Sequence, residues 1–253
     1  MTEIGIALLV FGCTFVGALL GMRMRSALPE QHLSDASKDV VHLCMGLIAT
    51  MTALILGLIT ASAKSTFDEQ DTAVRTAAAN VLTLDRTLAR FGPETKPLRE
   101  DLRSALTTAV ERIWKNDPGH APPASDGDRT TAVEKIEQGI LDLSPQSDAQ
   151  RWLQSQALGL ASDVLKARWL SFAGAGNAVP TAFLAVIVFW LTVLFWSFGL
   201  FAPRNGMVIG VLLLSTTSVA ASVFLILEMQ SPFEGVMQIS SAPLQYALAH
   251  LGQ

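Results

Sequence analysis

The chain has 253 residues, and 16% of them are charged, against about a quarter in a typical soluble domain. Half of the residues are apolar, the mean hydropathy is +0.40, and the net charge is −4, from 18 basic and 22 acidic groups. This composition excludes a disordered chain and a basic nucleic-acid-binding protein, and the two cysteines exclude a disulfide-rich scaffold.

Four stretches carry no charged residue: 4–22, 40–63, 169–203 and 205–227, with lengths of 19, 24, 35 and 23 residues. A helix of about 20 apolar residues crosses the hydrocarbon core of a membrane. Residues 64–168, in contrast, hold 14 basic and 16 acidic residues. The sequence therefore predicts an all-α membrane protein with four transmembrane helices and an extramembrane helical bundle inserted between spans two and three.

The first apolar stretch is predicted to be a retained membrane helix rather than a signal peptide. It follows Met1-Thr2-Glu3, which is not a basic segment, and it ends at Arg23 and Arg25 without a small-residue cleavage pattern. Within it, Gly17 and Gly21 have the spacing that lets two membrane helices approach closely.

The second apolar stretch is predicted to continue into water as one helix of about 50 residues, roughly 75 Å long. Small and apolar residues recur at alternating steps of three and four from Gly46 to Phe91, which is typical of a helix packed against neighbours at a shallow angle. No glycine or proline follows the span until Gly92-Pro93, where we expect the helix to end.

Three further helices are predicted in the polar region, over about residues 97–115, 129–143 and 144–171, with a loop at 116–128. Residues 172–180 are predicted to be a flexible hinge and 203–206 a tight turn. Pro243 is predicted to open a short helix that lies on the polar domain or at the membrane interface. The expected parts are 1–63, with spans one and two; 64–171, the extramembrane helical domain; 172–229, the transmembrane hairpin; and 230–253, with the short helix.

Signatures of catalysis and metal binding are absent from the sequence. It has no Walker loop, no His-Glu-x-x-His motif and no Cys-x-x-Cys pair. The histidines lack the spacing of metal ligands, and the cysteines lie in apolar runs, where cysteine behaves as a small hydrophobic residue. We therefore expect no enzyme activity, no metal site and no cofactor.

A stripe of small and weakly polar residues follows one face of the second span. It lines a water-filled path or packs against another helix, and packing is the commoner role. If there is a path, we expect it to be lined by Thr50, Ala53, Gly57, Thr60 and Lys64, with Lys64 as a basic group at its mouth. A structural ion pair between Lys64 and Glu228, which end their helices at the same membrane face, is the favoured role of that lysine.

Several segments resemble the bacterial bestrophin-like domain family. The similar segments include Gly46-Leu-Ile-Ala-Thr-Met-Thr-Ala-Leu-Ile-Leu-Gly57, Phe201-Ala-Pro-Arg-Asn205, Phe224-Leu-Ile-Leu-Glu228 and Ile239-Ser-Ser-Ala-Pro243. The resemblance implies a distant similarity to bestrophins, which are pentameric anion channels with four spans, a long second helix lining the pore and a cytoplasmic helical domain. The chain departs from them in lacking a neck of bulky apolar residues in the second span and an acidic calcium-binding cluster.

Two functions follow as alternatives. The first is an oligomeric ion channel, anion-selective and passive, with the second transmembrane helix around the axis and small anions as its cargo. The second is a non-conducting membrane scaffold or sensor whose helical domain binds a partner. Both imply a homo-oligomer in the lipid bilayer of the bacterial inner membrane, with no nucleic-acid partner, and the resemblance implies that this oligomer is a pentamer. The termini and the helical domain are expected on one side of the membrane, which the resemblance implies is the cytoplasm. Basic residues near the spans are balanced between the two sides, and the first helix alone would favour the cytoplasm for the loop that follows it, on the opposite side.

Overall fold

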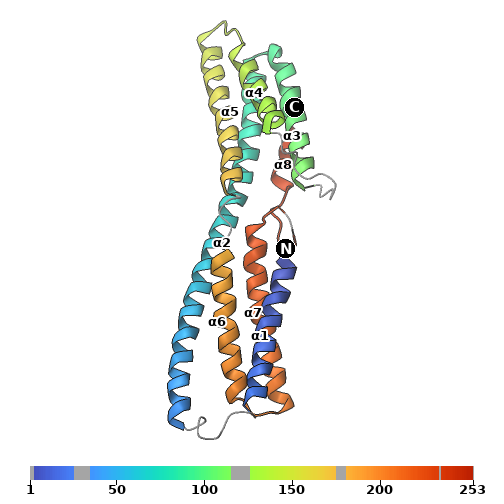
Figure 1. Ribbon diagram of the computed structural model, residues 1–253. Helices are drawn as coiled ribbons and strands as arrows, with labels where there is room; N and C mark the ends of the chain where they lie inside the picture. Colours follow the sequence, from blue (N-terminus) through green and yellow to red (C-terminus); the bar gives the residue numbers. More distant parts are fainter. Residues whose placement is uncertain (1–2, 26–34, 115–125, 175–180, 234, 253) are drawn as a thin grey trace. The chain divides into compact units, whose positions relative to one another are not determined.

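The computed structural model describes residues 3–25, 35–114, 126–174, 181–233 and 235–252. Its elements are α1 Glu3–Met24, α2 Asp35–Phe91, the short 3₁₀ helix η2 Pro93–Thr95, α3 Lys96–Trp114, α4 Asp126–Leu141, α5 Asp148–Gly174, α6 Thr181–Phe201, α7 Gly206–Gln230 and α8 Ala242–His250 (Figure 1). No strand occurs in these ranges. Within the described ranges, four helices are long and apolar enough to cross a membrane, namely α1, α2, α6 and α7. The predicted all-α membrane fold is therefore confirmed.

The chain divides into two compact units, and the boundary between them falls within α2. The membrane unit comprises Met1–Thr66 and Ala178–Ser231, and the extramembrane unit comprises Phe67–Asn177 and Pro232–Gln253. The prediction of one helix from the second span into the polar region is confirmed, because α2 runs without interruption over 57 residues.

In the membrane unit, α1 packs against α6 and α7 (Figure 1). The contact with α6 depends on glycine. A Cβ atom at Gly17 would lie 3.1 Å from the carbonyl oxygen of Thr192, one at Gly21 would overlap the carbonyl oxygen of Trp196, and one at Gly199 would overlap that of Ala18. The close approach predicted from the Gly17 and Gly21 spacing is thus present, with α6 as the neighbour. It brings the two backbones near enough for dispersion contacts that larger residues would prevent.

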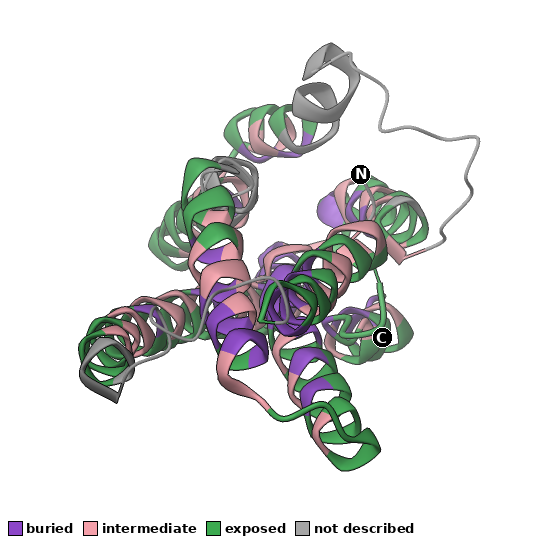
Figure 2. Cartoon of the chain, turned by 60° about the horizontal axis from the view of Figure 1, so that its bottom comes forward, coloured by how far each residue is buried: buried purple, intermediate pink, exposed green. Residues whose placement is uncertain are grey.

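The extramembrane unit has one apolar core. The seam of α2 supplies fully buried Leu84 and Leu88, and α4 supplies Ile136 and Ile140. The rest of this core comes from other α2 residues, from α3 and α5, and from the C-terminal segment, with Val74, Ala78, Val81, Leu102, Leu106, Ala157, Ala161, Ile239, Leu244, Ala247 and Leu251. Figure 2 shows for the chain as a whole that buried and exposed residues lie on different sides of the helices. The helical periodicity predicted part of this core, including Leu102, Ile136, Ile140 and Ala157; Leu106 and Ala161 lie outside the predicted stripes, and Ile113, which the stripe of the second polar helix includes, is 41% exposed.

One buried ion pair lies beside the core. Arg99 donates from Nε to Oδ1 of Asp85 at 2.7 Å and from Nη2 to Oδ2 at 2.9 Å, while the backbone N–H of Gly252 donates to Oδ2 at 3.3 Å. The Asp85 side chain is completely buried, and the Arg99 side chain is 17% exposed. The hydrogen bond to Asp85 is the main reason that the pKa of Arg99 lies above its usual value. This two-point contact joins α2, α3 and the end of the chain.

The C-terminal segment after α7 lies against the same unit. Trp114 donates from Nε1 to the carbonyl oxygen of Ile239 at 2.7 Å, and its ring meets the edge of Phe233. The helix α8 contacts α3, and Leu244 and Ala247 are buried in the shared core. Of the two places expected for the short helix, the structure has the one on the polar domain.

Two helix ends are set by hydroxyl groups. The buried hydroxyl of Thr95 donates to the carbonyl oxygens of Leu88 at 2.6 Å and Gly92 at 2.8 Å, which satisfies the end of α2. The expected start of a helix at Ser144-Pro145 is wrong, because α5 begins at Asp148. Ser147 precedes it and accepts from the backbone N–H of Gln150 at 3.2 Å, so Ser147 is the N-cap.

Two predicted segments lie largely outside the described residues. The loop expected at 116–128 and the hinge expected at 172–180 fall mostly in the ranges 115–125 and 175–180, which the structure does not describe. The turn expected at 203–206 is present: Asn205 precedes α7 in an extended conformation, and its side chain accepts from the backbone N–H of Val208 at 2.8 Å.

Candidate functional site

The membrane half of α2 exposes the predicted stripe. Gly46, Thr50, Ala53, Gly57, Thr60 and Lys64 are all exposed in the single chain. Their least exposed neighbours on the same helix include Thr52 and Ala63, which are 3% and 6% exposed and lie on another face. The structure therefore places the six residues together on one side of α2, and this side is not covered by the described part of the chain.

The glycines of this stripe differ from those of α1. A Cβ atom added at Gly46 or Gly57 would meet nothing within 4 Å, whereas one at Gly21 would overlap a backbone oxygen of α6. Glycine in α1 thus serves the close packing of two helices of this chain. Glycine in the membrane half of α2 serves no such contact within the described residues.

A second exposed stripe of large apolar side chains lies beside the first. At 100° per residue its centre is roughly 100° around the helix from the small residues. The exposed fractions of its side chains range from 47% to 75%, at Val40, Leu43, Leu47, Met51, Leu54 and Leu58. The membrane half of α2 therefore has two different outer faces, one small and weakly polar and one leucine-rich, which we call the small face and the leucine face.

The threonines of the small face have their hydroxyl protons directed into their own helix. Thr50 donates to the carbonyl oxygen of Gly46 at 2.8 Å, and Thr60 donates to that of Leu56 at 2.7 Å. In this arrangement the oxygen lone pairs, not the protons, are directed outward. The threonines alone would then offer hydrogen-bond acceptors to anything passing along this face.

Lys64 and Glu228 lie in different environments. Lys64 is exposed at the end of the small face, and Glu228, near the end of α7, is only 3% exposed. Near it, Ser231 donates from its hydroxyl to Glu3 at 3.2 Å, which joins the end of α7 to the start of α1. The predicted pairing of Lys64 with Glu228 stays a prediction, as does the pore-lining role of the small face.

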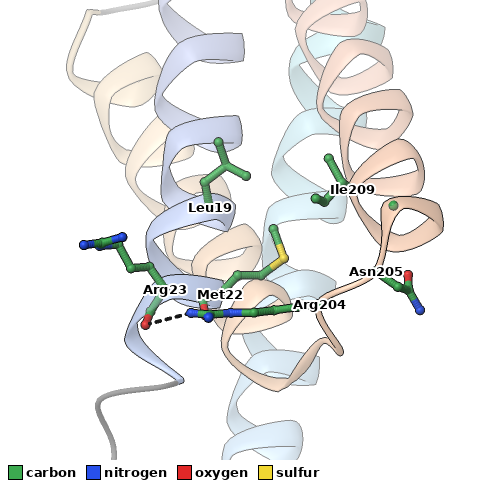
Figure 3. A pocket seen from close by; sticks show the side chains of 7 residues that line it. Leu19, Met22, Arg23, Arg204, Asn205 and Ile209 are labelled. Atoms are coloured by element: carbon green, nitrogen blue, oxygen red, sulfur yellow. Dashed lines mark hydrogen bonds between the residues drawn. The ribbon is translucent and has the colours of Figure 1, made fainter.

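At the other end of the membrane unit, two arginines hold the ends of helices. Arg204 donates from Nη2 to the carbonyl oxygen of Met22 at 2.9 Å and to that of Arg23 at 3.3 Å, at the end of α1 (Figure 3). Arg25 donates from Nη1 to the carbonyl oxygen of Ala202 at 2.6 Å, just after the end of α6. Each guanidinium therefore satisfies the free carbonyl oxygens of the other segment and lies at the negative end of a helix dipole.

A shallow hollow of about 440 Å³ opens beside these contacts, between α1 and the start of α7. Its lining residues are Leu19, Met22, Arg23, Arg204, Asn205, Gly206 and Ile209. The guanidinium groups of Arg23 and Arg204 lie on different sides of the end of α1, while Leu19 and Ile209 face the hollow from above (Figure 3). The sequence signal for this site was the arginines that directly border two apolar runs, and the sequence alone did not bring them together.

Among the described residues, no group of three or more His, Cys, Asp or Glu side chains is arranged to hold a metal ion.

The hydroxyl-bearing residues 215–218 of α7 do not share one environment. Thr216 is fully buried and donates to the carbonyl oxygen of Leu212 at 2.9 Å, whereas Thr217 is exposed. The small face of α2 is therefore the candidate site for transport, and the hollow at the end of α1 is a candidate site for a ligand.

Comparisons with known proteins agree with this architecture. Crystal structures of a bacterial bestrophin homologue from Klebsiella pneumoniae superimpose over nearly the whole chain. One mutant form gives a TM-score of 0.72 at 17% identity, covering 99% of this chain and 97% of that one. A second mutant form gives 0.70 at 19% identity with 100% coverage of both chains, and a structure phased with zinc gives 0.69 at 18% identity, covering 99% of this chain and 97% of that one. At these identities the similarity is one of fold.

No curated protein matches the chain. The family model described as the bestrophin-like domain matches residues 12–244, from the middle of α1 to the start of α8. Because this match covers three of the membrane helices, the second half of α1 and most of the extramembrane unit, the chain belongs to the bestrophin-like domain family.

Proposed function

We propose that copies of this chain assemble into a passive ion channel in which the small face of α2 surrounds a hydrated axis. The observation that carries the proposal is the open space at Gly46 and Gly57, on a face that also holds exposed Thr50 and Thr60. Small residues turned to lipid tails gain neither a close helix contact nor hydration of their hydroxyl groups. A ring of such faces around water gives the hydroxyl oxygens solvent and ions to contact.

The leucine face supports assembly of the same helix with itself. Its six exposed side chains lie roughly 100° around the helix from the small face. In a closed ring a neighbouring helix lies at less than about 90° from the direction of the axis, so the edge of the leucine face nearest the small face, at Leu43 and Leu54, would meet the α2 of an adjacent subunit. Large apolar side chains fill the space between neighbouring helices there. The resemblance to bestrophins favours a pentamer, and particle projections of the detergent-solubilised protein along its symmetry axis would give the subunit number.

The selectivity of the proposed path depends on Lys64. The hydroxyls of Thr50 and Thr60 donate inward, so their outward oxygens favour cations over anions. No residue from 40 to 63 is charged. The anion preference that we propose therefore rests on the positive charge of Lys64 at the mouth, where a ring of lysines would raise the local anion concentration.

Current through planar bilayers that contain the purified full-length protein tests conduction and selectivity. We expect current without an energy source. In a KCl gradient, we expect a reversal potential that lies closer to the equilibrium potential of chloride than to that of potassium. In Lys64→Met the reversal potential should shift toward the equilibrium potential of potassium. If Lys64 instead mainly pairs with Glu228, the substitution should lower the amount of folded protein more than it changes selectivity. If the purified oligomers are intact but pass no current, the result would favour the scaffold or sensor function.

Cysteine accessibility tests which face of α2 lines the path. In a background with Cys13 and Cys44 replaced by alanine, Ala53→Cys lies on the small face and Leu54→Cys on the leucine face, one residue apart. A charged, water-soluble thiol reagent should block current through Ala53→Cys and leave Leu54→Cys conducting. The reverse result would place the leucine face toward the axis and refute the assignment.

The proposed location is the bacterial inner membrane, with both termini and the extramembrane helices in the cytoplasm. Four spans place both ends of the chain on one side, and the resemblance implies the cytoplasmic side for the helical domain. Reporter fusions to the C-terminus, one active only in the cytoplasm and one active only in the periplasm, test the orientation. Activity of the periplasmic reporter alone would overturn it.

A further inference from the structure

We propose that the outer face of α5 docks on the outer face of the extramembrane half of α2 in a second copy of this chain. The proposal rests on the assembly of copies stated above, but it does not depend on ion conduction. Three observations within the extramembrane unit carry it: an exposed tryptophan on α5, arginines and small side chains on α2, and the heights of these groups along the bundle.

The outer face of α5 carries a large exposed aromatic side chain. Trp152 is 63% exposed, and at 100° per residue it lies on the side of α5 opposite to Ala157 and Ala161, which are each 1% exposed. The outer face consists of the exposed residues Asp148, Trp152, Ser155, Gln156, Gly159 and Asp163. A Cβ atom added at Gly159 would meet nothing within 4 Å, so the middle of this face is open to a close neighbour. Tryptophan is enriched among the residues that dominate the binding energy of protein interfaces.

The outer face of α2 offers small side chains and positive charge. Its exposed residues are Thr72, Arg75, Thr76, Ala79, Thr83, Arg86 and Arg90, and they lie opposite to the buried Val81 and Leu88. Between Arg75 and Arg86 no residue of this face is larger than threonine, which lets a second helix approach closely. From residue 72 to residue 90 the exposed charged residues of α2 are all basic.

The heights of the two faces follow from one hydrogen bond. Gln150 donates from Nε2 to the carbonyl oxygen of Phe91 at 2.9 Å, so the first turn of α5 is level with the end of α2, and α5 runs back along α2 (Figure 1). At 1.5 Å per residue, Trp152 is level with about residue 89 of α2, and Gly159 with about residue 82. Rotation about an axis parallel to the helices leaves every height unchanged, so the α2 of a neighbour in a ring presents the same residues at these heights.

Complementary groups lie at the matching heights. Trp152 is level with the segment between Arg86 and Arg90, and a guanidinium group stacks favourably on an indole ring. Gly159 is level with Thr83, and the small side chains of both let the two helix backbones come close. The aromatic contact therefore lies at one end of the interface, beside a stretch where the helices fit closely.

The charges of the two faces are of opposite sign. The side chains of Asp148 and Asp163 are 94% and 55% exposed, although Arg151 and Lys166 of the same helix pair with them. Both carboxylates therefore stay open to the arginines of a second α2. Attraction of this kind directs the encounter and fixes its register more than it adds affinity.

A second copy fits these faces better than lipid does. Roughly 40 Å of helix separates residue 63, the last of the charge-free run, from Arg90, so lipid does not reach Trp152. The two faces belong to one chain, and a contact between different faces of identical subunits repeats around a closed ring until each face is covered.

Disulfide crosslinking of the full-length protein in detergent tests the contact. In a background with Cys13 and Cys44 replaced by alanine, Thr83→Cys and Gly159→Cys are combined in one chain as the matched pair. Both positions are exposed. We expect mild oxidation to join the chains into dimers and higher multimers on a non-reducing gel, because each chain then forms one disulfide with each of its two neighbours.

Thr72→Cys combined with Gly159→Cys is the control pair, because Thr72 lies on the same face of α2 but roughly 15 Å further along the helix, beyond the reach of a disulfide. This pair should leave the chains largely unlinked. Trp152→Ala, added to the matched pair, should slow crosslinking about fivefold. Trp152→Phe should restore most of the rate, since it keeps an aromatic ring for the arginines.

Four results would overturn the proposal. Intact oligomers whose matched pair does not crosslink would refute this interface and leave the proposed channel standing, whereas single-subunit particles in mass photometry would refute both. Equal crosslinking of the matched and control pairs would show collisions between moving helices rather than one contact. Crosslinking of Thr83→Cys alone, as fast as that of the matched pair, would place α2 against α2 instead of against α5.

Discussion

The different environments of Gly57 and Gly21 make a quantitative prediction for the same substitution at two positions. Gly21→Ala places a methyl group against the carbonyl oxygen of Trp196, where the two helices have no room for it. Gly57→Ala places the same group in open space on the small face of α2. The chemistry of the change is identical, so any difference in stability reports the neighbours of each glycine.

The two substitutions are expected to change stability in opposite directions. Overpacking a tight helix contact costs about 1–3 kcal/mol, because α1 and α6 must move apart or distort. Replacing an uncrowded glycine in a helix with alanine gains at most about 1 kcal/mol through helix propensity. We therefore expect Gly21→Ala to be less stable than Gly57→Ala by roughly 1–4 kcal/mol, with the original protein between them.

Thermal unfolding of the purified oligomers in detergent, followed by the loss of helical circular dichroism at a fixed scan rate, measures this order. Unfolding of membrane proteins is often irreversible, so the comparison uses midpoints at one scan rate rather than free energies. Gly57→Ala should also keep its current in planar bilayers, and Gly57→Leu should reduce it. A destabilisation of Gly57→Ala as large as that of Gly21→Ala would show that a second subunit packs closely on the small face, and the reasoning for a hydrated path would be wrong.

Three other substitutions test the extramembrane unit, each by its unfolding midpoint. Asp85→Asn leaves Arg99 without its counter-charge and should cost about 3 kcal/mol, the low end for a buried pair because Arg99 retains some water contact. The pKa of Arg99 is raised in the folded state, so its contribution to stability is complete at every pH below its ordinary value and is lost only as the pH rises through the folded value. The deficit of Asp85→Asn at pH 7 should therefore persist at pH 10, and its disappearance would contradict this. Thr95→Val keeps the shape but removes the buried hydroxyl that donates to the carbonyl oxygen of Leu88 in the last turn of α2, for a loss of about 1–3 kcal/mol, while the carbonyl oxygen of Gly92 keeps the bond from the backbone N–H of residue 95. Ser147→Ala should cost about 1 kcal/mol as the loss of the α5 N-cap, and no change would assign the start of that helix to other contacts.

The membrane fold followed from the sequence because its signals are local. Uncharged runs of at least 19 residues define spans, and the unbroken step of three and four residues from Gly46 to Phe91 defines one long helix. The start of α5 was missed because a serine before a proline and a serine three residues before glutamine are both cap signals. Only the hydrogen bond from Gln150 to Ser147 distinguishes them.

What the sequence by itself determined is the number of membrane helices, the length of α2 and the face on which its small residues lie, since these depend on composition and on 100° per residue. The tertiary structure decided which glycines have neighbours: Gly17 and Gly21 contact α6, whereas a Cβ atom at Gly46 or Gly57 would meet nothing within 4 Å. It also brought Arg23 and Arg204 to one hollow and Asp85 to Arg99. The same residue types at the same spacing had both outcomes, because packing depends on which surfaces distant segments bring together, and a local pattern holds no information about its partner.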